Sequence, residues 1–383
     1  MKVTQIYEAT NTFFKEMLGE EAIVQEDLGN IVDLGNQLFN NQSFENYSKA
    51  LPDHIGRVIF VDRVYTGRYN GILREDWEWG GALEKIDMDL PEAEANQDWQ
   101  LTDGQSYDDH VFHQPKISVK FYQDRVAWSI PISITEEQVK SAFSSRGQYM
   151  AFVAMIGTKI ENAITARMEA LAKRADNNMI GETLADESTN VGAGKTGTRA
   201  INLLTLYKEA FPDSTITAAN ALLNLDFLKF AAYTIADVSD RMEEFSTGYN
   251  VAETPKFTPK NRQRIVLLSK FARAADMYLQ SDTFHDEFTR LPAATLVSYW
   301  QSGGPNTFAN DSQLNIQTAS GTAINQSGII GYIADIDAVM IAQLGRKVSS
   351  SYTAVADFTN FYHKVFAGYL NDLRENFVVF YIA

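Results

Sequence analysis

The stretch Lys116–Ser133, KISVKFYQDRVAWSIPIS, is the part of this sequence that most constrains the fold. Apolar and polar residues alternate along it, which is the pattern of a β-strand. An earlier stretch, Ile55–Tyr65 (IGRVIFVDRVY), concentrates Ile, Val, Phe and Tyr and also favours a strand. Between the two lie residues 66–115, which are polar and interrupted by glycines. Two strand-like limbs around a polar middle predict a long, extended hairpin.

The middle of the predicted hairpin is strongly acidic. It holds twelve Asp and Glu residues, opposed by Arg68, Arg74 and Lys85, which leaves a net charge of −9. A two-stranded ribbon is marginally stable alone, because it can bury only one narrow face. We therefore expect the hairpin to lie on a neighbouring subunit through a charge-matched contact. The alternative that the sequence leaves open is a solvated loop.

Trp77 and Trp79 are the most distinctive residues of this acidic middle, within the segment EDWEWGG. Residues two apart point to the same side of an extended chain, so the two indoles are predicted on one face. Tryptophan is enriched at the energetic centres of protein interfaces, which favours a hydrophobic anchor between subunits. The alternative is that the indoles hold the loop to its own body. The predicted inter-subunit contacts of the loop are Trp77, Trp79, Glu75, Asp76 and Asp87.

Beyond the hairpin, helical and strand-like patterns alternate. Thr135–Gln138 has the form of a helix capping box, and after Gly147 apolar residues recur at helical spacings to about Asp176. This predicts a helix of about thirty residues, roughly 45 Å long. The Gly-, Ser-, Thr- and Asn-rich stretch Glu182–Thr198 predicts a domain boundary. Further helices are predicted at Leu222–Met242, Ser269–Leu279 and Thr295–Gln301, and strands at Arg264–Leu268, Ile329–Ile333, Thr359–Leu370 and Phe377–Ile382.

Composition limits the classes of function. The 383 residues are enough for two or three domains, and 45% hydrophobic residues are enough for a packed core. The absence of cysteine excludes disulfides, thiolate metal sites and cysteine nucleophiles. A net charge of −16 disfavours sequence-specific binding of nucleic acid. No stretch reaches the roughly 18 apolar residues of a membrane span, and the N-terminus lacks the apolar core of a secretion signal, so we expect no membrane contact.

No motif predicts catalysis, a cofactor or a metal site. Residues 192–196 (GAGKT) resemble the end of a phosphate-binding loop, but Thr189 stands where that loop requires glycine, and the preceding residues are too polar for a buried strand. His110 and His113 lie near two aspartates, yet the spacing fixes no third metal ligand. We therefore predict no catalytic residue, no cofactor and no metal.

Four stretches carry a resemblance to a known family. They are Asp53–Val64, Lys120–Phe143, Ser145–Ile164 (SRGQYMAFVAMIGTKIENAI) and Gly331–Gly345 (GYIADIDAVMIAQLG). With the order of elements derived above, they resemble the major capsid proteins of tailed phages, which share the Hong Kong ninety-seven type fold. The chain is most similar to those of the small podoviruses of the phi-twenty-nine group. The resemblance covers most of the sequence.

This resemblance implies an α+β capsid fold with an N-terminal arm, an extended β-hairpin loop, a spine helix with a peripheral sheet, and an axial α/β domain. The implied function is a structural subunit, not an enzyme, that self-assembles into the icosahedral head shell enclosing the phage genome. The implied segments are an arm at 1–54, a strand and extended loop at 55–134, a peripheral domain with the spine helix at 135–183, an axial domain at 184–340, and a return to the peripheral domain at 341–383.

The resemblance also implies partners and a location. The subunit is expected to form hexamers and pentamers, to meet scaffolding and portal proteins, and to contact packaged double-stranded DNA non-specifically. Arg167, Lys173 and Arg174, on the predicted long helix, are candidates for local contact with that DNA. The expected location is the virion, after assembly in the host cytoplasm. The alternatives are the shell protein of a cellular nanocompartment, which shares the fold, and a nucleotide hydrolase built on Gly194-Lys195-Thr196.

Overall fold

The structure is a computed structural model, and it describes residues 63–68, 71–74, 83–91, 93, 103–104, 110, 112–122, 125–134, 146–281, 292–304, 307–308, 312–318, 321–355 and 358–383. The predicted arm, the predicted capping box and the tryptophan segment lie outside these residues. The chain divides into two compact units, which are described separately. The larger unit comprises residues 68–127, 167–345 and 366–383, and the smaller unit comprises residues 1–67, 128–166 and 346–365.

A five-stranded sheet forms the centre of the larger unit. Its strand order is β5-β15-β12-β6-β7, with β12 antiparallel to both of its neighbours and the two outer strands parallel to theirs. Every residue of β12 and β15 is buried, because these two strands are continuous apolar runs covered on both faces. The strands are β5 (Ala200–Asn202), β6 (Gln263–Leu268), β7 (Thr295–Val297), β12 (Ile329–Asp335) and β15 (Phe377–Tyr381).

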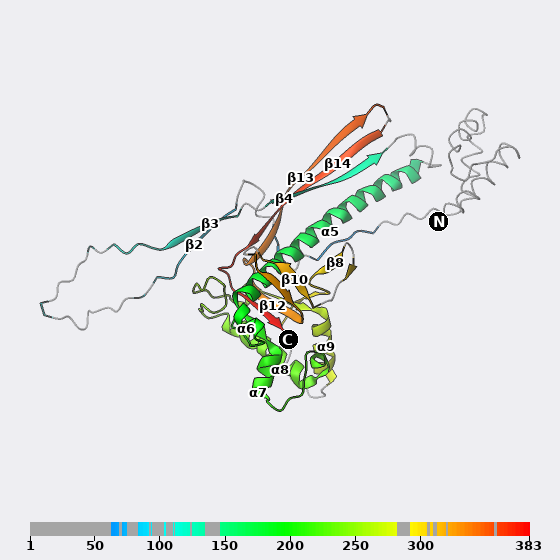
Figure 1. Ribbon diagram of the computed structural model, residues 1–383. Helices are drawn as coiled ribbons and strands as arrows, with labels where there is room; N and C mark the ends of the chain where they lie inside the picture. The colour runs from blue at the N-terminus through cyan, green and yellow to red at the C-terminus, as the bar shows by residue number, and fades with distance from the viewer. Residues whose placement is uncertain are drawn as a thin grey trace, which may run out of the picture. The chain divides into compact units, whose positions relative to one another are not determined.

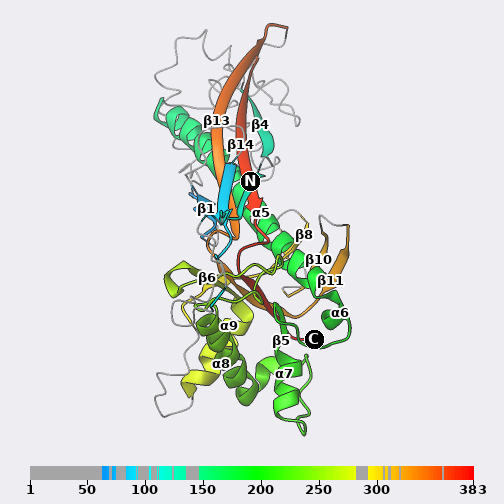
Figure 2. The same ribbon diagram turned by 90° about the vertical axis from the view of Figure 1, so that its left-hand side faces the viewer.

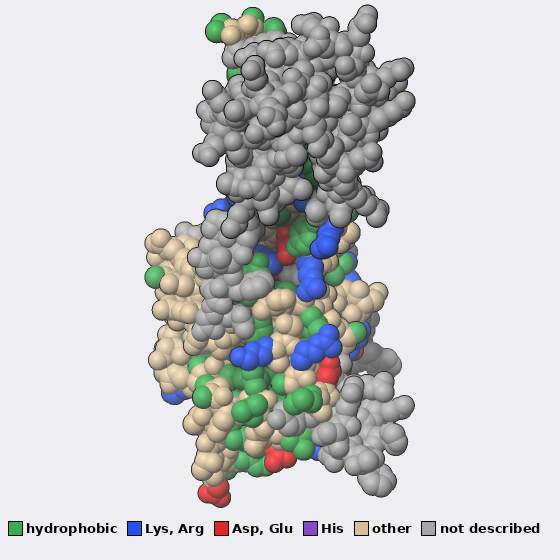
Figure 3. Space-filling view, turned by 90° about the vertical axis from the view of Figure 1, so that its right-hand side faces the viewer, with side chains coloured by type: hydrophobic (Ala, Val, Ile, Leu, Met, Phe, Trp, Pro, Cys, Tyr) green, Lys and Arg blue, Asp and Glu red, His purple; other side chains and the backbone are tan. Residues whose placement is uncertain are grey.

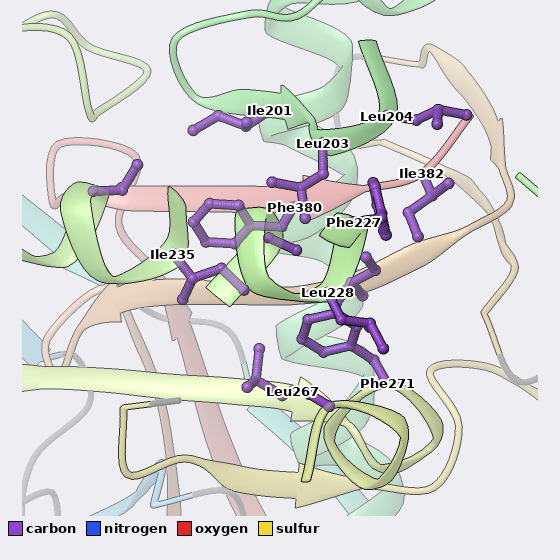
Figure 4. Packing of buried hydrophobic residues seen from close by; sticks show 14 of the residues in the cluster. Ile201, Leu203, Leu204, Phe227, Leu228, Ile235, Leu267, Phe271, Phe380 and Ile382 are labelled. Atoms are coloured by element: carbon purple, nitrogen blue, oxygen red, sulfur yellow. The ribbon is translucent and has the colours of Figure 1, made fainter. Parts of the chain in front are cut away.

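Three helices pack against one face of this sheet, α7 (Leu203–Ala210), α8 (Leu225–Arg241) and α9 (Ser269–Ser281). Figure 2 shows them gathered beside the sheet. The Asn224 side chain caps α8 by accepting a hydrogen bond of 2.9 Å from the Phe227 backbone N–H. Figure 4 shows the resulting core, in which side chains from the helices meet those of the strands. Its labelled members are Ile201, Leu203, Leu204, Phe227, Leu228, Ile235, Leu267, Phe271, Phe380 and Ile382.

The opposite face of the sheet meets α5 (Arg146–Asp186) through a buried ion pair. The Arg264 guanidinium lies 3.4 Å from a carboxylate oxygen of Asp176 and over the ring of Tyr332. The long helix predicted after Gly147 is thus confirmed, with 41 residues and a length of roughly 60 Å. It continues ten residues past the predicted end and enters the segment predicted as a domain boundary, because apolar residues such as Met179 and Ile180 extend its buried face.

The smaller unit has a much smaller core. Ile160 and Ile164 of α5 and Val365 are buried together, with Trp128, Ile130, Ile132 and Ile156 packed around them. The backbone near Tyr65 is held by Asn162, whose amide accepts a bond of 2.7 Å from the Tyr65 N–H and donates one of 2.6 Å to the Arg63 carbonyl. Strands of a second sheet, with the order β1-β13-β14-β4, run through this unit. The strands with residues in the smaller unit are β4 (Arg125–Ile134), β13 (Val339–Thr353) and β14 (Phe358–Asn371), whereas β1 (Leu73–Arg74) lies in the larger unit.

Two short hairpins also lie among the described elements. One joins β10 (Leu314–Gln317) and β11 (Ala323–Gln326), and the other joins β8 (Ser302–Gly304) and β9 (Thr307–Phe308). The helix predicted at Thr295–Gln301 is wrong. Its first half is strand β7, because the β-branched residues there pair with β6. Its second half is not helical, because Trp300 is buried and donates a hydrogen bond of 3.0 Å to the Ile329 carbonyl.

Candidate functional site

The predicted hairpin is present, but its upstream strand differs from the predicted one. β3 (Ile117–Tyr122) pairs antiparallel with β2 (Leu83–Met88), as Figure 1 shows. The prediction placed the upstream limb at Ile55–Tyr65, whose described residues 63–65 are not in a strand. The chosen partner is β2 because its own alternation of residue types matches that of β3 across six residue pairs.

The two faces of the β2–β3 hairpin differ in chemistry. One face carries five large apolar side chains, and all five are exposed to solvent. Ile86 and Val119 are directly opposite each other on this face, as are Met88 and Ile117. The apolar side chains of this face, called the apolar face below, are Ile86 (64% exposed), Met88 (53%), Ile117 (60%), Val119 (44%) and Phe121 (62%). Glu84, opposite Phe121, lies at the end of the same face and is exposed.

The opposite face, called the polar face below, carries Lys85, Asp87, Ser118 and Lys120 together with Leu83 and Tyr122. It is the face turned toward the rest of the larger unit. The Lys85 ammonium lies 2.6 Å from a carboxylate oxygen of Asp372 and 2.7 Å from one of Glu375. Lys120, opposite Lys85 in the register, lies 3.1 Å from the other oxygen of Asp372. Both acids belong to the segment between β14 and β15, so each strand of the hairpin is joined to that segment by an ion pair.

Two further contacts join the polar face to the larger unit. The Lys256 ammonium lies 2.6 Å from a carboxylate oxygen of Asp87 and 3.6 Å from one of Glu375. The Arg374 guanidinium donates a hydrogen bond to the Ser118 hydroxyl. The hairpin therefore inverts the usual arrangement of a ribbon on a protein body, in which the apolar face is buried and the polar face is solvated.

Lys85 and Asp372 are held in their charged forms by each other. Burial opposes the charge on Lys85, but the hydrogen bonds and charges of Asp372 and Glu375 outweigh it and raise the Lys85 pKa. Burial likewise opposes the charge on Asp372, but the hydrogen bond and charge of Lys85 outweigh it and lower the Asp372 pKa. Burial raises the pKa of Tyr122, and the charge of Asp372 adds to that rise. None of these shifts brings a pKa toward neutrality, as acid–base catalysis requires.

Only one of the predicted inter-subunit contact residues lies among the described residues. Asp87 is described, and its carboxylate faces Lys256 of its own chain. Trp77, Trp79, Glu75 and Asp76 lie outside the described residues. Sequence reasoning missed the apolar face, although the alternation in residues 83–90 and 117–122 was visible. That pattern is typical of a buried face, and nothing in it shows that here the apolar side is the solvent side.

The three candidate DNA-facing residues lie on α5 with different surroundings. Arg167 and Arg174 are exposed and seven residues apart, and so lie on one side of the helix. The Lys173 side chain is only 19% exposed, because its ammonium lies 3.0 Å from Glu169 and 3.8 Å from the centre of the Tyr299 ring. The structure thus leaves Arg167 and Arg174 as the accessible pair.

The segment 192–196 has the wrong surroundings for a phosphate-binding loop. A phosphate loop follows a strand and opens a helix, whereas here α6 (Ser188–Gly192) precedes the segment and β5 follows it. The nearby backbone amides are also occupied. The Glu187 carboxylate accepts hydrogen bonds from the N–H groups of Thr198, Arg199 and Ala200 at 3.0, 2.8 and 3.2 Å. Within the segment itself, the N–H groups of Ala193, Gly194 and Lys195 already donate to the backbone carbonyls of Asn190 and Val191.

The described residues hold neither a metal cluster nor a membrane-spanning helix. Within these residues, no group of three or more His, Asp or Glu side chains is arranged to hold a metal ion. No helix among the same residues has the length and apolar character needed to cross a membrane.

The fold is that of the shell subunits of tailed phages. A chain in the capsid structure of Staphylococcus phage Andhra matches with a TM-score of 0.52 and 11% identity, covering 86% of this chain and 87% of that chain. A chain in the structure of the head fiber and inner core protein of native bacteriophage P68 matches with a TM-score of 0.50 and 10% identity, covering 86% and 88%. At such low identity these matches show the fold alone.

The sequence assigns the family. The model of the family described as Phi29-like phage major capsid protein matches residues 10–381, and the chain belongs to this family. The comparison with curated proteins gives no match. The chain is therefore a structural subunit that assembles into a multimeric capsid shell of the virion, and it is not an enzyme. Neither the nanocompartment shell nor the nucleotide hydrolase is favoured.

Proposed function

We propose that the β2–β3 hairpin joins subunits of the shell by docking its apolar face on a neighbouring copy of the chain. One observation carries the proposal: the apolar face is exposed, while the charged face is paired within its own subunit. Removing apolar side chains from water lowers the free energy, so a contiguous exposed apolar surface favours binding to a partner. In a shell made of this chain, the partner at hand is a second copy.

Each such contact can be weak and still stabilise the assembly. A subunit in a closed shell contacts several neighbours at once, so modest contacts act together. Heterologous contacts that close through curvature are the kind that generate shells of many copies. A hairpin that reaches a neighbour with one face meets this requirement without a large apolar surface on the body of the subunit.

The acidic middle of the loop is proposed to extend this contact. Trp77 and Trp79 would act as apolar anchors, and Glu75 and Asp76 would face basic side chains of the neighbour. Asp87 is left out of this set, because Lys256 of the same chain already neutralises it. We also propose that residues 1–54 form an N-terminal arm and residues 184–340 an axial domain, as the sequence predicts.

The finer partners of the shell are also proposals. The subunits are proposed to form hexamers and pentamers around a scaffolding protein and a portal, within the host cytoplasm. Local contact with packaged DNA is proposed for Arg167 and Arg174, and for Lys173 only if its contact with Glu169 opens. Figure 3 shows one face of the molecule on which, among the described residues, Lys and Arg side chains lie among uncharged ones with few acids. Such contacts would be electrostatic and independent of sequence.

Site-specific photo-crosslinking tests the docking proposal. A benzoylphenylalanine in place of Phe121, on the apolar face, is expected to crosslink two subunits in assembled particles. The matched control places the same group at Tyr122, which points to the opposite face and is expected to crosslink within one chain. Crosslinks confined to one chain from both positions would overturn the proposal.

A second experiment addresses the tryptophans. The double change Trp77→Ala with Trp79→Ala is expected to leave the subunit folded and to reduce the number of closed shells seen by electron microscopy, with or without a scaffolding protein. If the double change unfolds the subunit instead, the indoles belong to its own core and not to the contact.

A further inference from the structure

The polar face of the hairpin meets its own subunit through a compact cluster of opposite charges. Asp372 is the centre of this cluster: its side chain is 2% exposed, and its two oxygens contact Lys85 of β2 and Lys120 of β3. Both strands are thus tied to one carboxylate. The ionic cluster consists of Lys85, Asp87, Lys120, Lys256, Asp372, Arg374 and Glu375.

The cluster joins three separate parts of the larger unit. Glu375 lies within 2.7 Å of Lys85 and 3.6 Å of Lys256, and so links the hairpin to the segment before η2 (Lys260–Arg262) as well as to the turn after β14. Asp87 contacts the same Lys256 from the hairpin side. A ribbon fixed at Lys85, Asp87 and Lys120 is held at three points, which is enough to define its direction.

We propose that the ionic cluster positions the β2–β3 hairpin, so that ionic strength and not apolar packing controls the direction of the hairpin. Among the described residues, the ion pairs and the Arg374–Ser118 hydrogen bond between the hairpin and the rest of the larger unit come from charged or hydroxyl side chains, while the five large side chains of the apolar face are exposed. Leu83 and Tyr122, which lie on the polar face, are partly buried. The inference rests on the proposed function, because it assigns to the cluster the task of presenting the apolar face to a neighbour.

The charges of the cluster suit this task. Four cationic and three anionic side chains leave a net charge of only about +1, so attraction outweighs repulsion within the cluster. The side chains of Lys85 and Lys256 are each 21% exposed, which leaves ions access to the edge of the cluster. Salt shortens the range of such interactions from about 8 Å at physiological ionic strength to about 3 Å at 1 M. High salt should therefore loosen the hairpin while the apolar core of the larger unit keeps its structure.

Pulsed electron paramagnetic resonance on the unassembled subunit tests the inference. The chain has no cysteine, so Met88→Cys on the hairpin and Tyr233→Cys on α8 provide two unique and exposed sites for spin labels. The expected result is a single narrow distance distribution at low salt, which broadens as sodium chloride is added. The change Lys85→Met keeps an unbranched side chain, one atom shorter than lysine, and removes its charge; it is expected to give the broad distribution at low salt.

The control variants separate the possible causes. Lys208→Met removes an exposed lysine of α7, outside the cluster, and should leave the distribution narrow. Glu375→Gln keeps the shape of its side chain and serves as a second cluster variant if Lys85→Met does not fold. Distributions in Lys85→Met and Glu375→Gln that match Lys208→Met would overturn the inference. Failure of the docking proposal gives a different result, because the apolar-face variants would assemble normally while the hairpin stays sensitive to salt.

Discussion

Replacing the opposed pair Ile86 and Val119 by threonine tests the proposed contact at its centre. Both residues point to solvent from neighbouring strands, and threonine keeps the β-branched shape that a strand prefers. The change removes apolar surface without altering charge. We expect the subunit to fold as before, with its free energy of unfolding changed by no more than about 0.5 kcal/mol, because exposed substitutions have effects of this size.

The expected effect on assembly follows from the exposed fractions. Ile86 is 64% exposed and Val119 is 44% exposed, so about half of each side chain can be buried by a neighbour. Complete burial of such a side chain contributes about 1.5–3 kcal/mol, and threonine retains part of the carbon surface, so the pair should lose roughly 2 kcal/mol per contact. This loss corresponds to about a 30-fold weaker association between two subunits.

Light scattering against subunit concentration measures this loss as a shift in the concentration at which shells form. Val64→Thr is the control, because Val64 is also exposed, at 77%, and lies outside the hairpin. The reasoning is refuted if the double variant assembles at the same concentration as the control. It is also refuted if the double variant melts at a much lower temperature, since the pair would then belong to the core of the subunit.

Three further predictions concern stability. Gly331→Ala should destabilise the fold by about 1–3 kcal/mol in thermal unfolding, because a Cβ there would overlap the Val266 carbonyl oxygen of the adjacent strand; an unchanged midpoint would contradict this packing. Asp176→Asn should cost about 3–5 kcal/mol in denaturant unfolding, because it leaves Arg264 as an unpaired buried charge. A double-mutant cycle with Arg264→Met should recover part of that cost, and strict additivity would argue against the pair. The lowered pKa of Asp372 contributes stability that is complete above the unfolded-state value near 3.9 and is lost as pH falls through the lower folded-state pKa. The free energy of unfolding should therefore fall at low pH, and this fall should be smaller in Asp372→Asn. An unchanged pH dependence in the variant would show that Asp372 does not contribute to it.

Elements with strong local patterns could be predicted from the sequence. The helix after Gly147 carries a stripe of apolar residues at helical spacing, and α5 is present there. The runs at Ile329–Ile333 and Phe377–Ile382 are apolar throughout, and both are strands at the buried centre of a sheet. In each case the local sequence predicts the correct secondary structure, because the tertiary packing favours the same secondary structure as the local sequence does.

The candidate site depends on information that local patterns do not contain. Alternation predicts a two-faced strand, but only the tertiary fold decides which face meets the body of the subunit. The polar face is turned inward because Lys85 pairs with Asp372 and Glu375 on the body of the subunit. These two acids lie 287 and 290 residues from Lys85 along the chain, so no local pattern contains them. The wrong helix at Thr295–Gln301 has the same origin, because the pairing of its first residues with β6 is a tertiary contact.

The central claim is that the apolar face of the hairpin is covered by another copy of the chain in the finished shell. An electron cryomicroscopy reconstruction of the assembled particle measures this directly. The account predicts that Ile86, Val119 and Phe121 of each subunit are buried against a neighbour while Lys85 still contacts Asp372 of its own chain. A reconstruction in which these three side chains remain in solvent, or fold back onto their own subunit, would contradict it.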